Sequence, residues 1–362
     1  MTRILHVITP SHMGGAEIFL NRLLQRSDST RVQNYCVSGE GRVNAEMRAC
    51  GMNFDSLPIG GKANLLAVAR LRKSARAVDA QLLHSHLSTA SWWCGWLTQF
   101  GGPPSIGHVH GFTSALWHRR QTHLIANSQA VRADLIRKGM SPERITVLHY
   151  PVDPADQRAT RSRSAIRDEL GVDEQTPVVG CFAHLSIKKG YQELVRAAVT
   201  VLRRMPAAQF WCFGEGSLRT ELQDFATAAG IADRFRLLGY RRDVPDLMRA
   251  IDVMCLPSHR EPFGLVYVEA ALAEKPVIAC LAGGAPEIIS HGETGLLVPP
   301  MEVPPLTEAI MTILENRSKS AAMGRRGRQL ALERFGWPLY LERLAELYDQ
   351  ILDQRQLRRQ AA

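Results

Sequence analysis

Short apolar runs alternate with longer amphipathic patterns along most of the chain. The apolar runs predict buried strands at Arg3–Ile8, Asn34–Ser38, Gln81–His86, Ile106–His110, Leu124–Ser128, Ile145–His149, Val178–Phe182, Gln209–Phe213, Phe235–Leu238, Val253–Leu256 and Pro276–Leu281. Apolar residues at helical spacing predict helices at Ala16–Arg26, Ala63–Val78, Gln129–Lys138, Tyr191–Arg204, Ser217–Ala229 and Pro305–Glu315, with further helices from Ser320 onward. This alternation is typical of parallel sheets with helices on both faces, so we expect an α/β fold.

The length and a change in sequence character predict two domains. A chain of 362 residues is too long for one ordinary hydrophobic core. Prolines and aspartates, followed by an arginine-rich segment, interrupt the α/β alternation after Tyr150. We therefore expect residues 1–155 and 176–335 to form two doubly wound, Rossmann-like domains, with a linker at 156–175. Helices in residues 336–362 can cross back to the first domain, and two such domains leave a cleft for a ligand.

The charge of the chain adds an expectation about partners. Its formal net charge is +9 and its pI is about 9.4. Such an excess of basic residues indicates phosphate-bearing ligands, nucleic acid or an anionic membrane surface, unless the protein is simply basic. We do not expect a nucleic-acid partner, because the sequence has no helix-turn-helix, zinc-ligand spacing or platform of aromatic and basic residues.

The cysteines and the N-terminus indicate a compartment. The seven cysteines are an odd number without a CxxC pair or a Cys/His metal spacing, which favours buried thiols in a reducing environment. The first apolar run is too short for a secretory signal, and no uncharged run of about 18 apolar residues occurs. We therefore expect a cytoplasmic protein without a metal or an organic cofactor.

A basic and aromatic region in the first half suggests attachment to the face of a membrane. Arg70, Arg72, Lys73 and Arg76 lie on adjoining turns of a predicted helix, and the segment Ser91–Leu97 contains three tryptophans. Such a surface suits peripheral binding to an anionic bilayer. The alternative is that Trp92, Trp93 and Trp96 belong to the core and that the basic helix face is only solvated.

Polar side chains gather at the predicted carboxyl ends of the strands in the first domain: His84, His86, His108, His110, Asn127 and Ser128. Ligands of open α/β sheets bind at this edge, so a histidine there can contact a reacting sugar or phosphate, although each can also be structural. Asn127-Ser128 fits equally well as the N-cap of the following helix. Gly14-Gly15, between the first strand and helix, forms either a ligand-binding loop or a plain tight turn.

The stretch from Pro257 to Pro300 carries the strongest functional signal. Its turn at residues 257–264 leads directly into an apolar helix, and a helix start offers backbone N–H groups to an anion, usually a phosphate. Glu261 in the turn and Glu269 on the helix are placed to hold hydroxyl groups attached to that phosphate. Lys189, in a loop between a strand and a helix, can neutralise charge on a leaving diphosphate. These residues together predict a nucleotide-sugar site.

Several short motifs follow one another in a fixed order: Gly14-Gly15-Ala16-Glu17, His110-Gly111, Lys189-Gly190, Gly214-Glu215-Gly216, Gly239-Tyr240, Pro257-Ser258, Glu261-Pro262-Phe263-Gly264 through Glu269, and the Gly-Gly-Ala-Pro-Glu turn at 283–287. In these motifs the chain resembles the retaining GT-B glycosyltransferases of family four over nearly its whole length. The segment from Glu261 to Glu269 is the strongest match and resembles the E-x7-E motif of that family.

The resemblance implies a role for each matching residue. The nucleotide diphosphate-sugar donor would bind mainly to the second domain, with Glu269 on the ribose hydroxyls, Glu261 on the donor sugar and Lys189 on the departing diphosphate. His110 would contact the donor sugar from the acceptor-side first domain. The remaining donor contacts would come from Gly14, Gly15, His184, Lys188, Gly214, Gly239, Tyr240, Arg241, Phe263, Gly264, Leu265, Val266. The implied product is a glycosylated saccharide or lipid-linked acceptor of an envelope polysaccharide, exopolysaccharide or lipopolysaccharide.

One position departs from the family, and two other functions stay open. His184 stands where the family usually has an arginine that clamps the diphosphate, and histidine cannot make a bidentate clamp. No Asp-x-Asp pair for a metal occurs at a suitable place, so we expect metal-independent transfer, with Lys189 and helix-start amides meeting the leaving charge. A nucleotide-sugar epimerase of the same fold and, less favoured, a non-catalytic nucleic-acid-binding protein are the alternatives.

Overall fold

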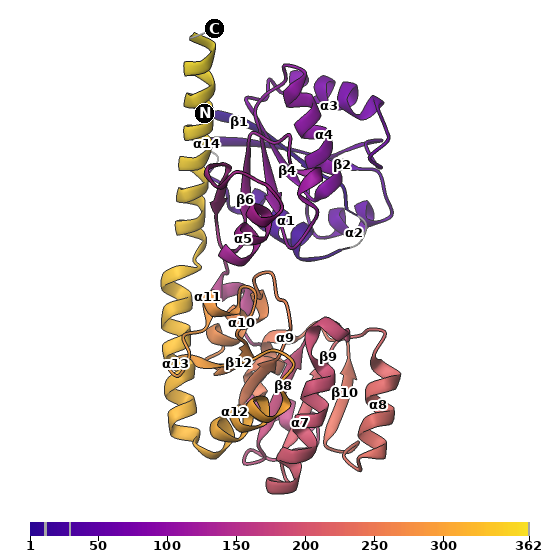
Figure 1. Ribbon diagram of the computed structural model, residues 1–362, viewed down its shortest axis with the longest axis vertical. Helices are drawn as coiled ribbons and strands as arrows, with labels where there is room; N and C mark the ends of the chain where they lie inside the picture. Colours follow the sequence, from indigo (N-terminus) through magenta and orange to yellow (C-terminus); the bar gives the residue numbers. More distant parts are fainter. Residues whose placement is uncertain (11–12, 29, 361–362) are drawn as a thin grey trace. The chain divides into compact units, whose positions relative to one another are not determined.

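The computed structural model describes residues 1–10, 13–28 and 30–360 and divides the chain into two compact units (Figure 1). Unit 1 comprises Met1–Tyr150 together with Trp337–Ala362, and unit 2 comprises Pro151–Gly336. Each unit is a parallel sheet with helices packed on it, as the alternation of apolar runs and amphipathic patterns predicts. The predicted pair of doubly wound α/β domains is therefore confirmed.

Unit 1 has seven strands in the order β3-β2-β1-β4-β5-β6-β7. The strands are β1 (Thr2–Ile8), β2 (Val32–Gly39), β3 (Asp55–Leu57), β4 (Leu82–His86), β5 (Ser105–Val109), β6 (His123–Ala126) and β7 (Ile145–Val147). Its helices are α1 (Gly15–Arg26), α2 (Val43–Ala49), α3 (Leu66–Ala77), α4 (Ser88–Gln99), α5 (Gln129–Arg137) and α14 (Trp337–Gln360), with short 3₁₀ turns η1 (Ala115–Trp117) and η2 (Pro142–Arg144).

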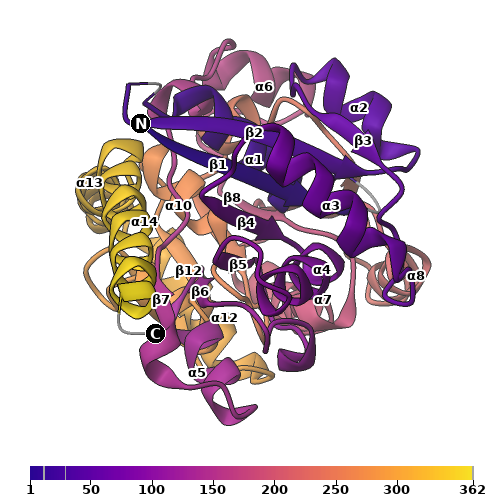
Figure 2. The same ribbon diagram turned by 90° about the horizontal axis from the view of Figure 1, so that it is seen from above.

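The two faces of this sheet have different chemistry. On one face, Leu5 and Val7 of β1 pack with Leu71 of α3 and Leu97 of α4 in a hydrophobic cluster. Because successive side chains of a strand point to opposite faces, His6 lies on the other face. Helices α1 and α14 belong to the same unit (Figures 1 and 2). They contribute aromatic residues to that second face, among them Phe19 and Tyr340, whose ring centroids lie 5.6 Å apart.

Unit 2 has six strands in the order β10-β9-β8-β11-β12-β13. The strands are β8 (Val178–Phe182), β9 (Gln209–Phe213), β10 (Phe235–Gly239), β11 (Val253–Leu256), β12 (Val277–Cys280) and β13 (Gly295–Val298). The helices are α6 (Arg163–Glu169), α7 (Tyr191–Arg204), α8 (Arg219–Ala228), α9 (Val244–Ala250), α10 (Leu265–Leu272), α11 (Ala285–Ile288), α12 (Val303–Glu315) and α13 (Arg317–Arg334), with 3₁₀ turns η3 (Pro154–Gln157) and η4 (Ile187–Lys189).

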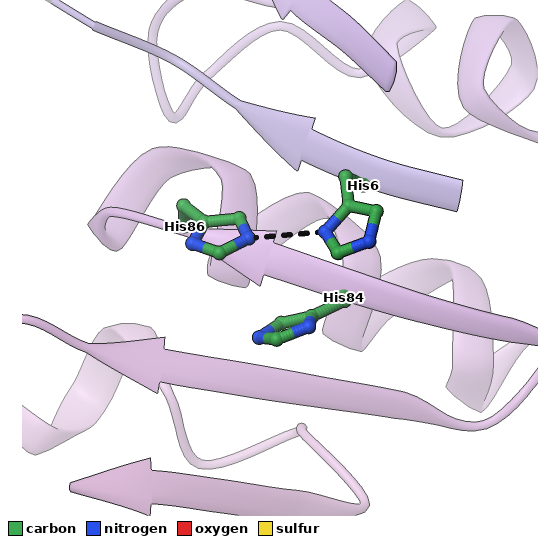
Figure 3. Close-up of side chains that lie close together, drawn as sticks. All are labelled: His6, His84 and His86. Atoms are coloured by element: carbon green, nitrogen blue, oxygen red, sulfur yellow. Dashed lines mark hydrogen bonds between the residues drawn. The ribbon is translucent and has the colours of Figure 1, made fainter. Parts of the chain in front are cut away.

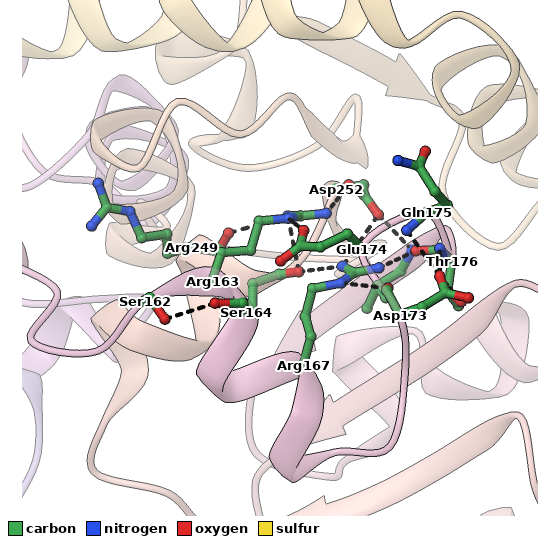
Figure 4. A network of polar contacts seen from close by, with 12 residues as sticks. Ser162, Arg163, Ser164, Arg167, Asp173, Glu174, Gln175, Thr176, Arg249 and Asp252 are labelled. Atoms are coloured by element: carbon green, nitrogen blue, oxygen red, sulfur yellow. Dashed lines mark hydrogen bonds and ion pairs between the residues drawn. The ribbon is translucent and has the colours of Figure 1, made fainter.

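Residues 156–175, which we expected to be a linker, lie within unit 2. Arg167 of α6 is fully buried and donates to the carbonyl oxygen of Ala250 at 2.7 Å and to that of Asp173 at 2.9 Å (Figure 4). Arg163 donates to the carboxylate of Asp252 at 2.7 Å, and this carboxylate also accepts from the N–H of Val178 at 2.8 Å. The arginines that gave this segment a linker-like composition therefore attach it to the β8–β11 edge of the domain.

The cysteines are free thiols, as their spacing indicates, and all except Cys50 are buried. Cys50 is exposed because it caps the end of the short surface helix α2. No helix in the described parts of the chain is both long and apolar enough to cross a membrane.

Candidate functional site

The predicted donor-binding residues of unit 2 follow neighbouring strands at the carboxyl edge of the sheet. The loops after these strands are bonded to one another through the main chain. The N–H of Gly214, after β9, donates to the carbonyl oxygen of Gly239, the last residue of β10, at 2.8 Å. The N–H of His259, after β11, donates to the carbonyl oxygen of Lys188, after β8, at 2.9 Å. These hydrogen bonds connect loops that are 25 and 71 positions apart in the sequence.

Lys189 and Glu261, both predicted from the sequence as catalytic residues, form an ion pair. The ammonium nitrogen of Lys189 lies 2.5 Å from Oε2 of Glu261. The side chains are 18% and 11% exposed, so water screens the two charges less than it would at the open surface. Because a carboxylate and an ammonium at this distance hold each other in place, the pair fixes a positive charge beside the turn that starts α10.

The position of Lys189 depends on the glycine that follows it. Gly190 has φ +72°, and a Cβ there would lie 2.0 Å from the carbonyl oxygen of Pro257. The hydroxyl of Ser258 also donates to the carbonyl oxygen of Lys188 at 3.1 Å. Only glycine lets the η4 turn approach the β11 loop this closely, and the approach brings Lys189 to Glu261.

The turn from Glu261 to Gly264 directs a helix start toward the same edge. Its bend is tight: Gly264 has φ +101°, and the N–H of Gly284 donates to the carbonyl oxygen of Glu261 at 2.8 Å. Phe263 is buried and anchors the turn. Leu265 and Val266, in the first turn of α10, are partly exposed. The first N–H groups of a helix have no partner within the helix, so this turn can receive an anion.

Glu269 lies farther along α10, and its neighbour was not foreseen. The Oε1 of Glu269 accepts from the side-chain amide of Gln157 at 3.4 Å. Gln157 belongs to the segment that we expected to be a linker, and nothing in its local sequence marks it as part of a site. Glu269 is partly exposed.

Four other predicted donor-binding residues differ in what they offer. His184 and Lys188 are exposed, as is Tyr240, with 70% of its surface accessible. The guanidinium of Arg241 is engaged by carboxylates: it donates to both oxygens of Asp243, at 2.8 and 2.6 Å, and to Glu169 at 2.8 Å. These hydrogen bonds to Asp243 and Glu169 raise the pKa of Arg241. Arg241 therefore orders its own loop within unit 2, whereas His184, Lys188 and Tyr240 are available to a ligand.

In unit 1, Gly14 and Gly15 start helix α1. The N–H of Gly14 donates to the carboxylate of Glu17 at 3.1 Å, and the carbonyl oxygen of Gly14 accepts from Ile18 in the first turn. Gly15 is exposed, and a Cβ at this position would meet nothing within 4 Å. The pair is thus a helix start whose second glycine is not required by packing, which leaves room for a ligand there.

His110 is held from several sides at the end of β5. The hydroxyl of Tyr150 contacts Nδ1 of His110, and Nε2 of His110 lies 3.1 Å from Nδ1 of His86. Asn127 donates to the carbonyl oxygen of His110 at 3.0 Å. Burial lowers the pKa of His110 to about 3, so its imidazole is neutral at physiological pH. Ser128 caps α5 by accepting from the N–H of Val131 at 3.0 Å, the alternative role named above.

His110, which is partly buried, lies beside four fully buried histidines on one face of the unit 1 sheet: His6, His84, His86 and His108. Burial is also the main cause that lowers the pKa values of the other four. The sequence indicated the histidines of β4 and β5 but not His6, because the pairing of β1 with β4 becomes visible only in the sheet. The register places His6 opposite His84.

The three tryptophans of α4 are engaged within unit 1. Trp93 is 2% exposed, and its indole N–H donates to the carbonyl oxygen of Gly61 at 2.8 Å. Trp92 donates to the carbonyl oxygen of Lys62 at 3.2 Å, and the guanidinium of Arg120 lies 3.8 Å from the ring centroid of Trp96. Exposed apolar side chains of unit 1 include Leu65 and Leu66, at the start of the basic helix α3, which are 83% and 62% exposed, and Phe100, which is 59% exposed and stacks on Trp96.

Two family models match the chain, one for each half. The model described as Glycosyltransferase Family 4 matches residues 13–156, and the model described as Glycosyl transferases group 1 matches residues 162–330. The second match contains Lys189, Glu261 and Glu269, and the first contains His110.

Relatives and solved structures agree with these matches. The chain is 24% identical over 319 residues to an alpha-D-kanosaminyltransferase of Streptomyces kanamyceticus, which covers 80% of this chain and 82% of that protein. It is also 31% identical over 218 residues to a GDP-mannose-dependent monoacylated alpha-(1-6)-phosphatidylinositol monomannoside mannosyltransferase of Corynebacterium glutamicum. The matching region is 58% of this chain and only 54% of that protein. The crystal structure of Anabaena Alr3699/HepE in complex with UDP has a TM-score of 0.85 and 26% identity and covers 97% of this chain and 100% of that one.

Proposed function

Because the chain belongs to the GT-B glycosyltransferases of the family-four type, we propose that it moves a sugar from a nucleotide diphosphate-sugar to a saccharide or lipid-linked acceptor with retention of configuration. Sugar transfer in glycan synthesis is the activity common to its relatives. The observation that carries the proposal is the Lys189–Glu261 pair beside the start of α10. It combines a fixed positive charge, a carboxylate and helix-start amides at one edge of the sheet.

The chemistry follows from these groups. The diphosphate binds at the first turn of α10, where backbone amides and the helix dipole stabilise its charge. Lys189 stabilises the negative charge that develops on the diphosphate as the bond to the sugar breaks. Glu261 accepts hydrogen bonds from hydroxyls of the donor sugar, and Glu269 from those of the ribose. Lys189 and the amides neutralise the leaving group, so the reaction does not require a metal at the diphosphate. The departing phosphate oxygen takes the proton of the acceptor hydroxyl on the same face of the sugar.

Residues of unit 1 complete the proposal. Both ring nitrogens of His110 have partners within the unit, so a contact with the donor sugar requires His110 to exchange its hydrogen bond with His86 for a sugar hydroxyl. Gly14 and Gly15 offer the start of α1 to the phosphates or to the acceptor. His184 and Lys188, both exposed in the loop after β8, replace the arginine clamp of the family with weaker, monodentate contacts.

The donor is tested by thermal shift with UDP-, GDP-, ADP- and TDP-sugars, since a bound donor stabilises the folded state. UDP-glucose is the first candidate, because HepE was crystallised with it, and GDP-mannose is the second, from the name of the corynebacterial relative. We expect one nucleotide series to raise the melting temperature. We expect Glu269→Ala and Lys189→Ala to reduce transfer at least about 100-fold. Lys319→Ala, an exposed lysine on α13, is the control and should leave transfer unchanged.

Two results would contradict the proposal. Unchanged transfer in both Glu269→Ala and Lys189→Ala would exclude this site as the donor site. Conversion of the donor sugar into its epimer in the absence of any acceptor would identify a nucleotide-sugar epimerase instead. Incubation of the donor alone, followed by analysis of the sugar released from the nucleotide, distinguishes the two activities.

We also propose that the acceptor belongs to envelope polysaccharide, exopolysaccharide or lipopolysaccharide and is reached at an anionic membrane surface. Leu65 and Leu66 are exposed at the start of α3, whose Lys73 and Arg76 are exposed farther along the helix. Apolar residues beside basic ones suit insertion among anionic headgroups. We expect the protein to sediment with phosphatidylglycerol-containing vesicles and not with phosphatidylcholine vesicles. The variant Leu65→Ser/Leu66→Ser should reduce this binding. If the variant sediments with the vesicles as well as the wild type does, Leu65 and Leu66 are not part of a membrane-binding surface.

A further inference from the structure

The buried histidines of unit 1 form a group of side chains that sugar transfer does not require. Two sets of three lie with one ring nitrogen of each within 4.8 Å of the others: His6, His84 and His86, and then His86, His108 and His110. Both sets consist of histidines alone, and they share His86. Fully buried polar atoms need partners, so a layer of imidazoles inside a domain requires an explanation.

We propose that His6, His84 and His86 bind a divalent transition-metal ion of the zinc class through His6 Nδ1, His84 Nε2 and His86 Nε2. The site lies wholly within unit 1, between strands β1 and β4 (Figure 3). It is separate from the donor-binding residues of unit 2, and the proposal does not depend on the transfer reaction.

The distances suit coordination. Two nitrogens bound to one tetrahedral zinc at about 2.0–2.1 Å lie about 3.3–3.4 Å apart. His6 Nδ1 and His86 Nε2 are 3.3 Å apart, which matches that separation and is long for a hydrogen bond. The third nitrogen, Nε2 of His84, is buried and has no hydrogen-bond partner. A fully buried imidazole nitrogen without a partner beside two others is the arrangement that an ion would satisfy.

The other ring nitrogen of each ligand is already oriented. Nε2 of His6 lies 3.0 Å from Oδ1 of Asn34, and Nδ1 of His84 lies 2.6 Å from the hydroxyl of Tyr348. Nδ1 of His86 lies 3.1 Å from Nε2 of His110. Histidines that bind metals almost always use their second nitrogen in this way, which fixes the ring and its tautomer. The second set lacks this property, because both nitrogens of His110 are engaged by Tyr150 and His86.

The backbone provides a rigid support. His6 and His84 are directly opposite each other in the parallel β1–β4 pair, and His84 and His86 are two residues apart on one strand and therefore share a face. Three imidazole nitrogens form the protein ligand set of a typical three-histidine zinc site.

Coordination assigns the protons. His6 keeps its proton on Nε2 and donates to Asn34. His86, bound through Nε2, carries its proton on Nδ1 and donates to Nε2 of His110, whose own proton then lies on Nδ1 toward Tyr150. No ligand has to lose a proton, because each imidazole is neutral before and after binding.

The test uses the full chain and zinc as the probe. The protein is produced in zinc-supplemented medium and purified without chelator, and its zinc content is measured by inductively coupled plasma mass spectrometry. We expect about one zinc per chain. A second sample is unfolded with chelator and refolded with Co²⁺, which should give the absorption bands of four-coordinate cobalt. We also expect refolding with Zn²⁺ to raise the melting temperature relative to refolding with chelator.

Matched variants locate the site. His84→Gln and His6→Gln should lower the zinc content at least about tenfold. His108→Gln, a fully buried histidine of the same layer that is not a proposed ligand, should keep one zinc. The proposal is refuted if the wild-type protein holds less than a tenth of an equivalent after both growth and refolding with zinc. Equal loss of zinc in His108→Gln and His84→Gln would also refute it. If His84→Gln fails to fold, the cobalt spectrum and the zinc-dependent melting temperature of the wild type decide.

Discussion

The ion pair between Lys189 and Glu261 predicts a competition that binding experiments can measure. Without donor, the Lys189 ammonium is 2.5 Å from the Glu261 carboxylate. A diphosphate that binds Lys189 must therefore draw the ammonium away from a carboxylate that already neutralises it. Glu261→Gln keeps the size of the side chain and removes its charge. We expect this variant to bind the free nucleoside diphosphate more tightly, although it transfers sugar more slowly.

The size of the effect follows from the geometry. A hydrogen bond between charged groups contributes about 1.5–3 kcal/mol, and the pair is mostly buried, at 18% and 11% exposure. Releasing Lys189 from half of that interaction is worth about 0.8–1.5 kcal/mol and tightens binding about 4- to 12-fold. Lys189→Met should weaken nucleoside diphosphate binding about 10- to 100-fold and lower kcat about 100- to 1000-fold. The double variant has neither the Glu261 carboxylate nor the Lys189 ammonium. Glu261→Gln then has no ammonium to release, so the affinity of the double variant should equal that of Lys189→Met.

Isothermal titration with UDP and GDP measures these affinities in the four proteins of the double-mutant cycle. Circular dichroism and urea unfolding check that each variant is folded, since loss of a charged partner leaves the other group unpaired at a cost of about 1–3 kcal/mol. Equal or weaker diphosphate binding by Glu261→Gln would refute the competition. Unchanged kcat in Lys189→Met would refute its role at the leaving group, whatever happens to binding.

Three further variants test the fold around the sites. Gly190→Ala should lower the free energy of unfolding by at least about 2 kcal/mol in urea titrations, because φ is +72° and the new Cβ would lie 2.0 Å from the carbonyl oxygen of Pro257. The control Gly60→Ala, where a Cβ would meet nothing within 4 Å, should change the free energy of unfolding by less than about 0.5 kcal/mol. Equal effects of the two substitutions would show that the close approach to Pro257 does not require glycine. Arg167→Met should lower the free energy of unfolding by about 3–5 kcal/mol, because it removes a buried guanidinium and leaves the groups that it contacts without a donor. The same substitution at the exposed Arg196 should leave the free energy of unfolding nearly unchanged. A small decrease for Arg167→Met would show that the network is not needed for stability. Burial lowers the pKa of His118 to about 4, below its value of 6.5 in the unfolded chain, so its contribution is complete above pH 6.5 and is lost as the pH falls toward 4. His118→Gln should therefore reduce the stability difference between pH 7 and pH 5 by about 2 kcal/mol, and an unchanged difference would show that His118 titrates normally in the folded state.

The sequence predicted the strands and the site residues best where the signal is local. The run Arg3–Ile8 corresponds to β1 at Thr2–Ile8, and Pro276–Leu281 to β12 at Val277–Cys280, because buried parallel strands are continuously apolar. The strands β3 and β13, each at the edge of its sheet, were not predicted. β3 has the sequence Asp-Ser-Leu and is largely exposed, so it has no apolar run that would reveal it. The loops after β8 and β11 were recognised from glycines, a lysine and carboxylates close to strand ends.

Features that depend on distant residues could not be predicted. Lys189 and Glu261 were each assigned to the donor, but their mutual contact spans 72 positions. The arginines of residues 156–175 resembled a solvated linker because their acceptors, such as Ala250 and Asp252, lie more than 80 residues away. His6 lies beside the other histidines because β1 pairs with β4 as well as with β2. The sequence does not reveal this strand order.

Helix α14 has a consequence for how the protein is made. Unit 1 closes the face that bears His6, His84 and His86 with α14, whose Tyr348 contacts His84, yet the whole of unit 2 is encoded between β7 and this helix. At about 5–20 residues per second, a ribosome needs about 10–40 s to translate that interval. For that time the histidine face of the nascent chain lacks the part of its cover that α14 provides. An ion that could hardly enter the finished domain thus has a period, during every round of synthesis, in which its ligands are open to the solvent.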